Sequence, residues 1–135
     1  MSAPTRKLEL DLRPERFAVV RLARGADIPW WVESSTFFSV TRAENELSII
    51  CDETAVPKAG NAVGGLRCLA VRGPLGFSEV GILSSLARPL ADAHIGIFTI
   101  SSFDTDYIFV EDDSVERAVT VLSEAGHVVH SADGA

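Results

Sequence analysis

No apolar run in this sequence reaches the roughly 18 residues that a membrane-spanning helix requires, so no transmembrane segment is expected. The N-terminal residues MSAPTRKLEL lack the apolar core of a secretory signal, which favours a cytoplasmic location. Cysteine is scarce, and Cys51 and Cys68 both lie inside apolar runs where we expect buried, reduced thiols. Neither has partners at metal-ligand spacing. The sequence therefore predicts no disulfide and no metal site.

Positive charge is also scarce, because 12 Lys and Arg stand against 19 Asp and Glu, giving a net charge of -7. No basic stretch interleaved with aromatic residues occurs, so neither nucleic acid nor an anionic membrane surface is an expected partner. The G-x-G-x-x-G and Walker patterns are missing, and we expect no cofactor. What remains is a chain of 135 residues, 47% of them hydrophobic, which is enough for one compact body or two small halves that share a core.

The first half of the sequence has the pattern of a β-α-β-β unit. Short runs rich in β-branched residues predict three strands, and the second and third are joined by a polar hairpin. Between the first two strands, Asp27 is expected to cap a short helical turn with Pro29 in its first turn. The expected elements are a strand at 16–23, a helical turn at 27–31, and strands at 37–42 and 47–52. The Gly-rich segment 57–65 marks the boundary with the second half.

The second half has the pattern β-α-β-β-α-β. Apolar residues at helical spacing predict a first helix, in which Pro89 removes the backbone donor that would bond to the carbonyl of Ser85 and should bend the helix. A second helix is expected to begin with Asp113 as its N-terminal cap and to stop at Gly126. The expected elements are strands at 66–72, 95–103, 105–111 and 127–131 and helices at 79–93 and 113–125.

Together these patterns predict an α+β protein with antiparallel sheets and helices on one face. A complete ferredoxin-like βαββαβ domain would occupy residues 61–135, after a degenerate βαββ unit in residues 1–60. The strand at 95–103 is apolar on both faces for most of its length. The face away from the helices therefore needs a cover, either from the other half of the chain or from another subunit.

The run GFSEVGILSSLARPLADAHIGIFTISSFDTDYIFV, residues 76–110, resembles an ACT domain. More narrowly, it is similar to the aspartokinase-like subgroup that includes the CASTOR-type amino-acid sensors. The resemblance is strong over residues 66–129 and weak over the first half. It implies amino-acid binding and regulation without catalysis, a ligand held between two ACT units, and a homodimer or a regulated protein partner. The positions that the resemblance marks as ligand contacts are Gly76, Phe77, Ser78, Glu79, Val80, Gly81, Ser101, Ser102, Phe103, Asp104, Thr105 and Asp106.

The residues themselves also suit a small zwitterion. The loop at 76–81 leads into a helix whose first amides favour an anion such as an α-carboxylate, although its glycines could simply form the turn, with Ser78 as the helix cap. Asp104 and Asp106 could bind an ammonium or guanidinium group, or could only form the turn. Ser78 is not expected to be a nucleophile, because Gly81 follows one residue too late for the pattern G-x-S-x-G.

We therefore expect a sensor or regulatory protein that binds an amino acid and is not an enzyme. The alternative is an interaction module, in which the apolar second face drives assembly independently of any ligand. The histidines are expected to be strand-end residues, and His127 and His130, three apart on a strand, would face opposite sides.

Overall fold

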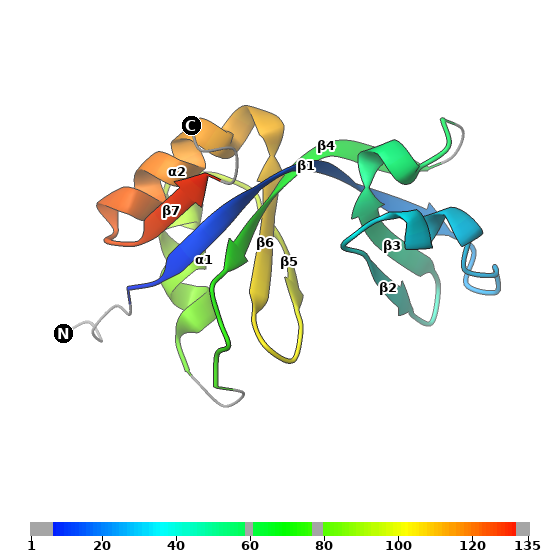
Figure 1. Cartoon of the computed structure of the whole chain (residues 1–135), viewed down its shortest axis with the longest axis horizontal. Coiled ribbons are helices and arrows are strands. Elements are labelled where there is room, and N and C mark those ends of the chain that lie inside the picture. The colour runs from blue at the N-terminus through cyan, green and yellow to red at the C-terminus, as the bar shows by residue number, and fades with distance from the viewer. Residues whose placement is uncertain (1–6, 59–60, 77–79, 132–135) are drawn as a thin grey trace. The chain divides into compact units, whose positions relative to one another are not determined.

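The computed structural model describes residues 7–58, 61–76 and 80–131, which form two compact units (Figure 1). The smaller unit is Glu15–Leu66, and the larger unit combines the residues up to Pro14 with those from Arg67 onward. Two long strands, β1 (Glu9–Leu22) and β4 (Ala62–Val71), each contribute to both units. The division thus differs from the predicted one, which assigned the N-terminal residues entirely to the first half.

The larger unit contains a five-stranded sheet in the order β7-β1-β4-β6-β5. Its further elements are α1 (Ile82–Asp92), β5 (Phe98–Ser101), β6 (Asp106–Glu111), α2 (Val115–Glu124) and β7 (Val128–Ser131). The predicted α+β ferredoxin-like fold is confirmed, with one addition. The first part of β1 lies between β7, with which it pairs in parallel, and β4, whose end it contacts through Arg72 N–H and the carbonyl of Glu9 (2.8 Å).

The inserted strand was missed by the sequence analysis, which placed the first strand at 16–23. Its signal is the alternation in KLELDLR, since Leu8, Leu10 and Leu12 point to one face and the charged residues between them to the other. Leu8 and Leu10 are buried in the core of the larger unit. The N-terminal residues therefore complete the core of a domain whose other residues lie more than 50 positions later.

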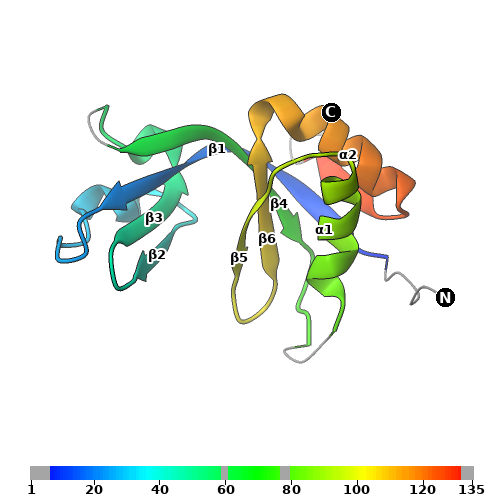
Figure 2. The same ribbon diagram turned by 180° about the vertical axis from the view of Figure 1, so that it is seen from behind.

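Both helices lie on the same face of this sheet, as predicted (Figure 2). They pack against each other and against the apolar residues of β1, β4 and β6. The buried residues of this core are Leu8, Leu10, Leu69, Val71, Ile82, Leu86, Leu90, Ile95, Ile108, Val110, Ala118 and Leu122. Removing these side chains from water is the main favourable contribution to the stability of the unit.

A buried histidine compensates for the proline inside α1. Pro89 has no N–H, so the carbonyl of Ser85 lacks its intrahelical donor. His127 Nε2 lies 3.1 Å from that carbonyl, and His127 Nδ1 accepts a hydrogen bond from the amide of Leu8 (3.1 Å). Because an amide can only donate, Nδ1 is the acceptor and the proton is on Nε2. His127 is thus more than a strand-end residue, since it joins α1 to the start of β1.

Two predicted helix caps are wrong. The acidic run at 111–114 forms an additional 3₁₀ turn, Asp112–Ser114, so α2 begins at Val115 and Asp113 does not cap it. In the smaller unit the helical turn is a 3₁₀ helix, Trp30–Ser34, which begins three residues after Asp27. In contrast, the stop after α2 is confirmed, because Gly126 follows the helix with a φ of 99°.

The smaller unit contains the predicted hairpin of β2 (Ser39–Arg42) and β3 (Leu47–Asp52). β3 also pairs antiparallel with the second part of β1, from Phe17↔Asp52 to Leu22↔Leu47. Its core consists of Val20, Val32, Leu47, Ile49 and Cys51. Cys51 here and Cys68 in the larger unit are buried, as predicted.

The second face of the larger unit is not continuously apolar. Phe98 on the edge strand β5 packs edge-to-face on Phe109 of β6, with ring centroids 6.2 Å apart, and stays partly exposed. Toward β1 and β4 the same face carries charged side chains, among them Asp11 and Arg72.

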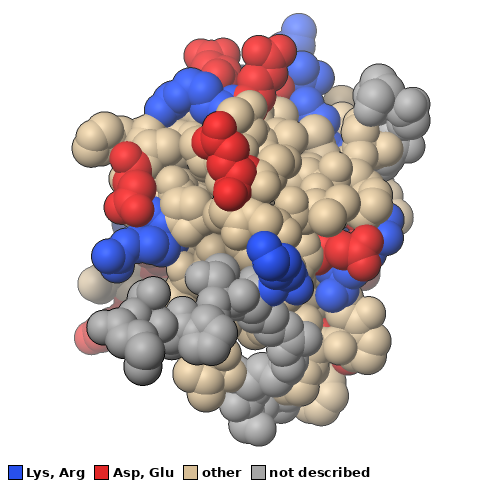
Figure 3. All heavy atoms as spheres, turned by 90° about the vertical axis from the view of Figure 1, so that its left-hand side faces the viewer, with Lys and Arg blue, Asp and Glu red and all other residues tan. Residues whose placement is uncertain are grey.

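On the face that α2 and β7 occupy, Figure 3 shows basic and acidic side chains dispersed among uncharged ones.

Shortening a β1 side chain tests the inserted strand. Leu10 has 0% exposure, so Leu10→Ala should lower the free energy of unfolding by about 2–5 kcal/mol, measured by urea denaturation. Ile28→Ala in the smaller unit is the control, because Ile28 is 52% exposed and its truncation should cost under about 1 kcal/mol. A loss at Leu10 as small as that at Ile28 would contradict the burial of β1 in this core.

Candidate functional site

A pocket of about 460 Å³ lies in the larger unit where the β4–α1 loop and the first turn of α1 meet the β5–β6 hairpin. Figures 1 and 2 both show this loop and the hairpin turn at the same end of the sheet. The residues that line the pocket are Leu75, Gly76, Gly81, Ile82, Leu83, Ser84, Ser101, Ser102, Phe103, Asp104, Thr105 and Asp106.

The first turn of α1 forms one wall of the pocket. Gly81 is the N-cap residue with a φ of 87°, a left-handed conformation that glycine adopts without a steric penalty. Its carbonyl accepts hydrogen bonds from the amide of Ser85 (3.0 Å) and the hydroxyl of Ser84 (3.2 Å). The amides of Ile82, Leu83 and Ser84 come before the first intrahelical bond and have no carbonyl partner within the helix. This end of α1 therefore favours a negatively charged group.

The hairpin forms the opposite wall and carries two carboxylates. The hydroxyl of Ser101 donates to Asp106 Oδ1 (2.6 Å), and the two residues are paired in the strand register. Ser102 and Thr105 close the turn through a bond from Ser102 N–H to the carbonyl of Thr105 (2.8 Å). Asp104 lies exposed in this turn. Among the described residues that line the pocket none is basic, so backbone donors face carboxylates across it.

Two hydrogen bonds join the hairpin to the end of β4 and to the loop that follows it. The amide of Leu75 donates to the carbonyl of Asp104 (2.7 Å), and the hydroxyl of Thr105 donates to the carbonyl of Val71 (2.6 Å). Gly73 lies against the same turn, where a Cβ atom would be 2.9 Å from the carbonyl oxygen of Asp104. A larger residue would therefore push the turn away.

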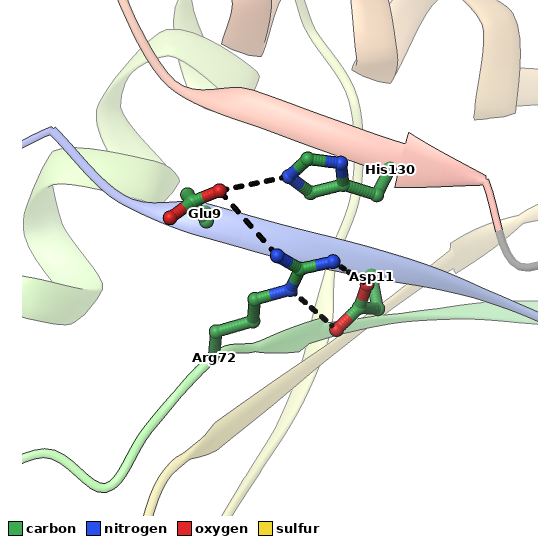
Figure 4. Close-up of polar contacts among 4 residues, drawn as sticks. All are labelled: Glu9, Asp11, Arg72 and His130. Atoms are coloured by element: carbon green, nitrogen blue, oxygen red, sulfur yellow. Dashed lines mark hydrogen bonds and ion pairs between the residues drawn. The ribbon is translucent and has the colours of Figure 1, made fainter.

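Arg72 anchors the start of this loop to β1 (Figure 4). Its Nε and Nη2 donate to both carboxylate oxygens of Asp11 (3.0 and 2.9 Å), and its Nη1 lies 3.4 Å from Glu9 Oε1. Glu9 also contacts Nε2 of His130 on β7 (2.9 Å). The hydrogen bond from Arg72 lowers the pKa of Asp11 and raises the pKa of Arg72 itself. The network connects β1, β7 and the residue that follows β4 at the base of the pocket loop.

Most of the predicted site residues lie together around this pocket. Those that line it are Gly76, Gly81, Ser101, Ser102, Phe103, Asp104, Thr105 and Asp106. Val80 does not line it, and its side chain is 93% exposed. Phe77, Ser78 and Glu79 lie outside the described residues. That any of these residues binds a ligand stays a prediction.

The sequence analysis missed the lining residues on either side of the predicted loop. Leu75 precedes that loop, and Ile82, Leu83 and Ser84 follow it. The last three were missed because α1 was expected to begin at residue 79 and begins at Ile82. The signal in the sequence was Gly81, because glycine readily adopts the left-handed conformation that this residue has just before the helix.

Among residues 7–58, 61–76 and 80–131, no three His, Cys, Asp or Glu side chains are grouped so that they could hold a metal ion. None of the helices in this described part of the chain has the length and apolar character needed to cross a membrane.

The family model of the ACT domain matches residues 61–124, and a model of an N-terminal domain matches residues 15–59. The chain thus contains an ACT domain. We therefore call the larger unit the ACT unit. A solved structure of a protein from Agobacterium tumefaciens is 33% identical with a TM-score of 0.88, covering 96% of this chain and 95% of that chain.

Two further proteins resemble this chain, one in sequence and the other in fold. The human protein named cytosolic arginine sensor for mTORC1 subunit 1 is 35% identical over 97 residues, 66% of this chain. This chain spans about 30% of the length of that relative. The regulatory subunit of aspartate kinase from Thermus flavus is 10% identical with a TM-score of 0.59, covering 86% of this chain and 95% of that chain, and so shares the fold.

Lowering the pH should remove the contribution of the Arg72–Asp11 pair to stability. The pair lowers the pKa of Asp11 in the folded state below 3.8, so its contribution is present above pH 3.8 and is lost as the pH falls through the folded-state pKa. The difference in free energy of unfolding between wild type and Asp11→Asn should be constant from about pH 5 to 7 and shrink below about pH 4.

Urea unfolding over a pH series measures this difference. The control is the same substitution in an Arg72→Met background, where the hydrogen bond that contributes most to lowering the pKa of Asp11 is missing and the pH dependence should be smaller. A difference that grows as the pH falls would contradict the assignment.

Proposed function

We propose that this chain is a regulatory or sensor protein that binds an amino acid in the pocket of its ACT unit and performs no chemistry on it. The observation that carries the proposal is the arrangement of backbone donors at the start of α1 opposite two carboxylates on the hairpin. An α-carboxylate fits the helix end, and an ammonium or guanidinium group fits Asp104 and Asp106. The volume of about 460 Å³ lies in the range that small-molecule sites occupy.

The relatives support the regulatory part of this proposal. One of them is named a cytosolic arginine sensor and another is a regulatory subunit of aspartate kinase. Neither name is that of a catalytic subunit. The same support extends to a cytoplasmic location.

We further propose that a second ACT unit, for example from another copy of the chain, covers the bound ligand. Phe103 lines the pocket with 80% of its side chain exposed, and Val80 next to Gly81 is 93% exposed. Apolar side chains this exposed beside a site are typical of a surface that another protein covers. A ligand held there would favour one oligomeric state or geometry and would stabilise it by linkage.

A thermal shift screen of the twenty standard amino acids tests the binding proposal. At least one of them should raise the melting temperature of the protein. Asp106→Asn should lower the affinity for that amino acid by about ten- to hundredfold, because a charge-assisted hydrogen bond is lost. Asp27→Asn is the matched control, since Asp27 is an exposed aspartate of the smaller unit. If none of the twenty changed the melting temperature, the amino-acid proposal would be wrong.

The second candidate is a ligand-independent interaction module, which the same exposed Phe103 and Val80 favour. Light scattering with and without each amino acid separates the two functions. Phe103→Ser should weaken assembly in either case, because it removes apolar area from the contact. An oligomer whose mass and melting temperature no amino acid changes would favour the module, whereas a ligand-dependent mass favours the sensor.

A further inference from the structure

We propose that Thr105 is a positioning residue, whose hydroxyl holds the hairpin wall of the pocket against the segment leaving β4 and so sets the width of the pocket. The inference rests on the proposed function only for what the pocket binds. The link itself is a property of the protein without ligand and can be tested separately.

The hydroxyl of Thr105 is committed to the protein backbone. It donates to the carbonyl of Val71 over 2.6 Å, between residues 34 positions apart. A hydroxyl has a single hydrogen, so the Thr105 side chain has no further donor for a ligand. The resemblance predicted a ligand contact at this position, and the geometry adds a second role for the side chain, the link between two segments.

The link lies at the point where the strands end. Val71 is the last residue of β4, and Thr105 immediately precedes β6, which begins at Asp106. The side-chain bond therefore continues the connection between these neighbouring strands into the turn that forms the pocket wall. Without it, this turn would be attached to the β4–α1 loop through the bond from Leu75 N–H to the carbonyl of Asp104.

Close packing at Gly73 shows that this link has little room to vary. A Cβ atom at this position would be 2.9 Å from the carbonyl oxygen of Asp104 and 3.3 Å from Cβ of Thr105. The first of these atoms belongs to the backbone and can move only with the turn. Gly73 and Thr105 thus both control the distance between the hairpin turn and the chain at the end of β4.

Hydrogen exchange of the Leu75 amide measures the link in the protein without ligand. Thr105→Val keeps the shape of the side chain and removes the donor, and we expect the Leu75 amide to exchange about two- to twelvefold faster, the effect of losing one hydrogen bond. Thr105→Ser keeps the hydroxyl and should restore exchange to within about twofold of wild type. Thr99→Val is the matched control, because Thr99 is exposed on the neighbouring strand β5 and should leave Leu75 unchanged.

Binding supplies a readout that a purely structural role would not move. An equimolar mixture of the twenty standard amino acids serves as the probe, and the concentration giving half of the maximal thermal shift is recorded for each variant. Thr105→Val should raise this concentration about three- to tenfold, and Thr105→Ser and Thr99→Val should leave it within about twofold. An unchanged concentration for Thr105→Val would overturn the positioning role.

The two proposals fail in different ways. If the mixture does not change the melting temperature of the wild type, the proposed function is wrong. The exchange rate of the Leu75 amide then tests the link by itself. If Thr105→Val does not fold, Gly73→Ala replaces it, because its added Cβ pushes the turn away and should also speed Leu75 exchange. Gly25→Ala is its control, since a Cβ atom at Gly25 meets nothing within 4 Å. Unchanged Leu75 exchange in the folded variants would overturn the link.

Discussion

The ACT unit depends on a strand that comes from the other end of its sequence. The first part of β1 lies between β7 and β4, and among the described residues β7 pairs with β1 alone. The N-terminal segment that includes this strand supplies Leu8 and Leu10 to the core. The carbonyl of Glu9 accepts a hydrogen bond from the amide of Arg72. The C-terminal strand is therefore held in the sheet by the N-terminal one. This explains why the compact unit joins segments that are separated by the whole smaller unit.

Polar contacts around this strand connect the sheet to the pocket. His127 joins Leu8 to the helix α1 by using the carbonyl that Pro89 leaves without a donor. Arg72 extends from the end of β4 to Asp11 on β1, which fixes the residue just before Gly73. From there the hairpin is held by its bonds to the β4 end and the following loop. The width of the pocket thus follows from contacts that begin in the sheet and not from the lining residues alone.

The arrangement also separates two roles among residues of similar chemistry. Ser101 and Thr105 both carry hydroxyls on the hairpin, but one donates to Asp106 inside the pocket and the other to the backbone of β4. Substituting the first would change the charge distribution that a ligand meets, whereas substituting the second would change the position of the wall. Two hydroxyl side chains of one hairpin therefore have different partners, one a carboxylate in the pocket and the other the backbone at the end of β4.

Local patterns in the sequence were sufficient for much of the fold. The family resemblance marked eight of the twelve residues that line the pocket. Helical spacing of apolar residues located α1 and α2, and alternation and turn residues located the hairpins. These features depend on neighbours within a few residues, so composition and periodicity can reveal them. The helix caps predicted at Asp27 and Asp113 were wrong, because the exact start of a helix also depends on contacts with residues far away in the sequence.

The tertiary structure alone decided which distant segments meet. The alternation around Leu10 shows that a strand can form, but only packing selects β7 and β4 as its neighbours. The bond between Leu8 and His127 spans 119 positions, and that between Thr105 and Val71 spans 34. A hydrogen bond requires atoms to lie within about 3 Å of each other, and no local pattern encodes that approach. The sequence thus determined the elements and the chemistry of the pocket, while the folded chain determined its walls and their spacing.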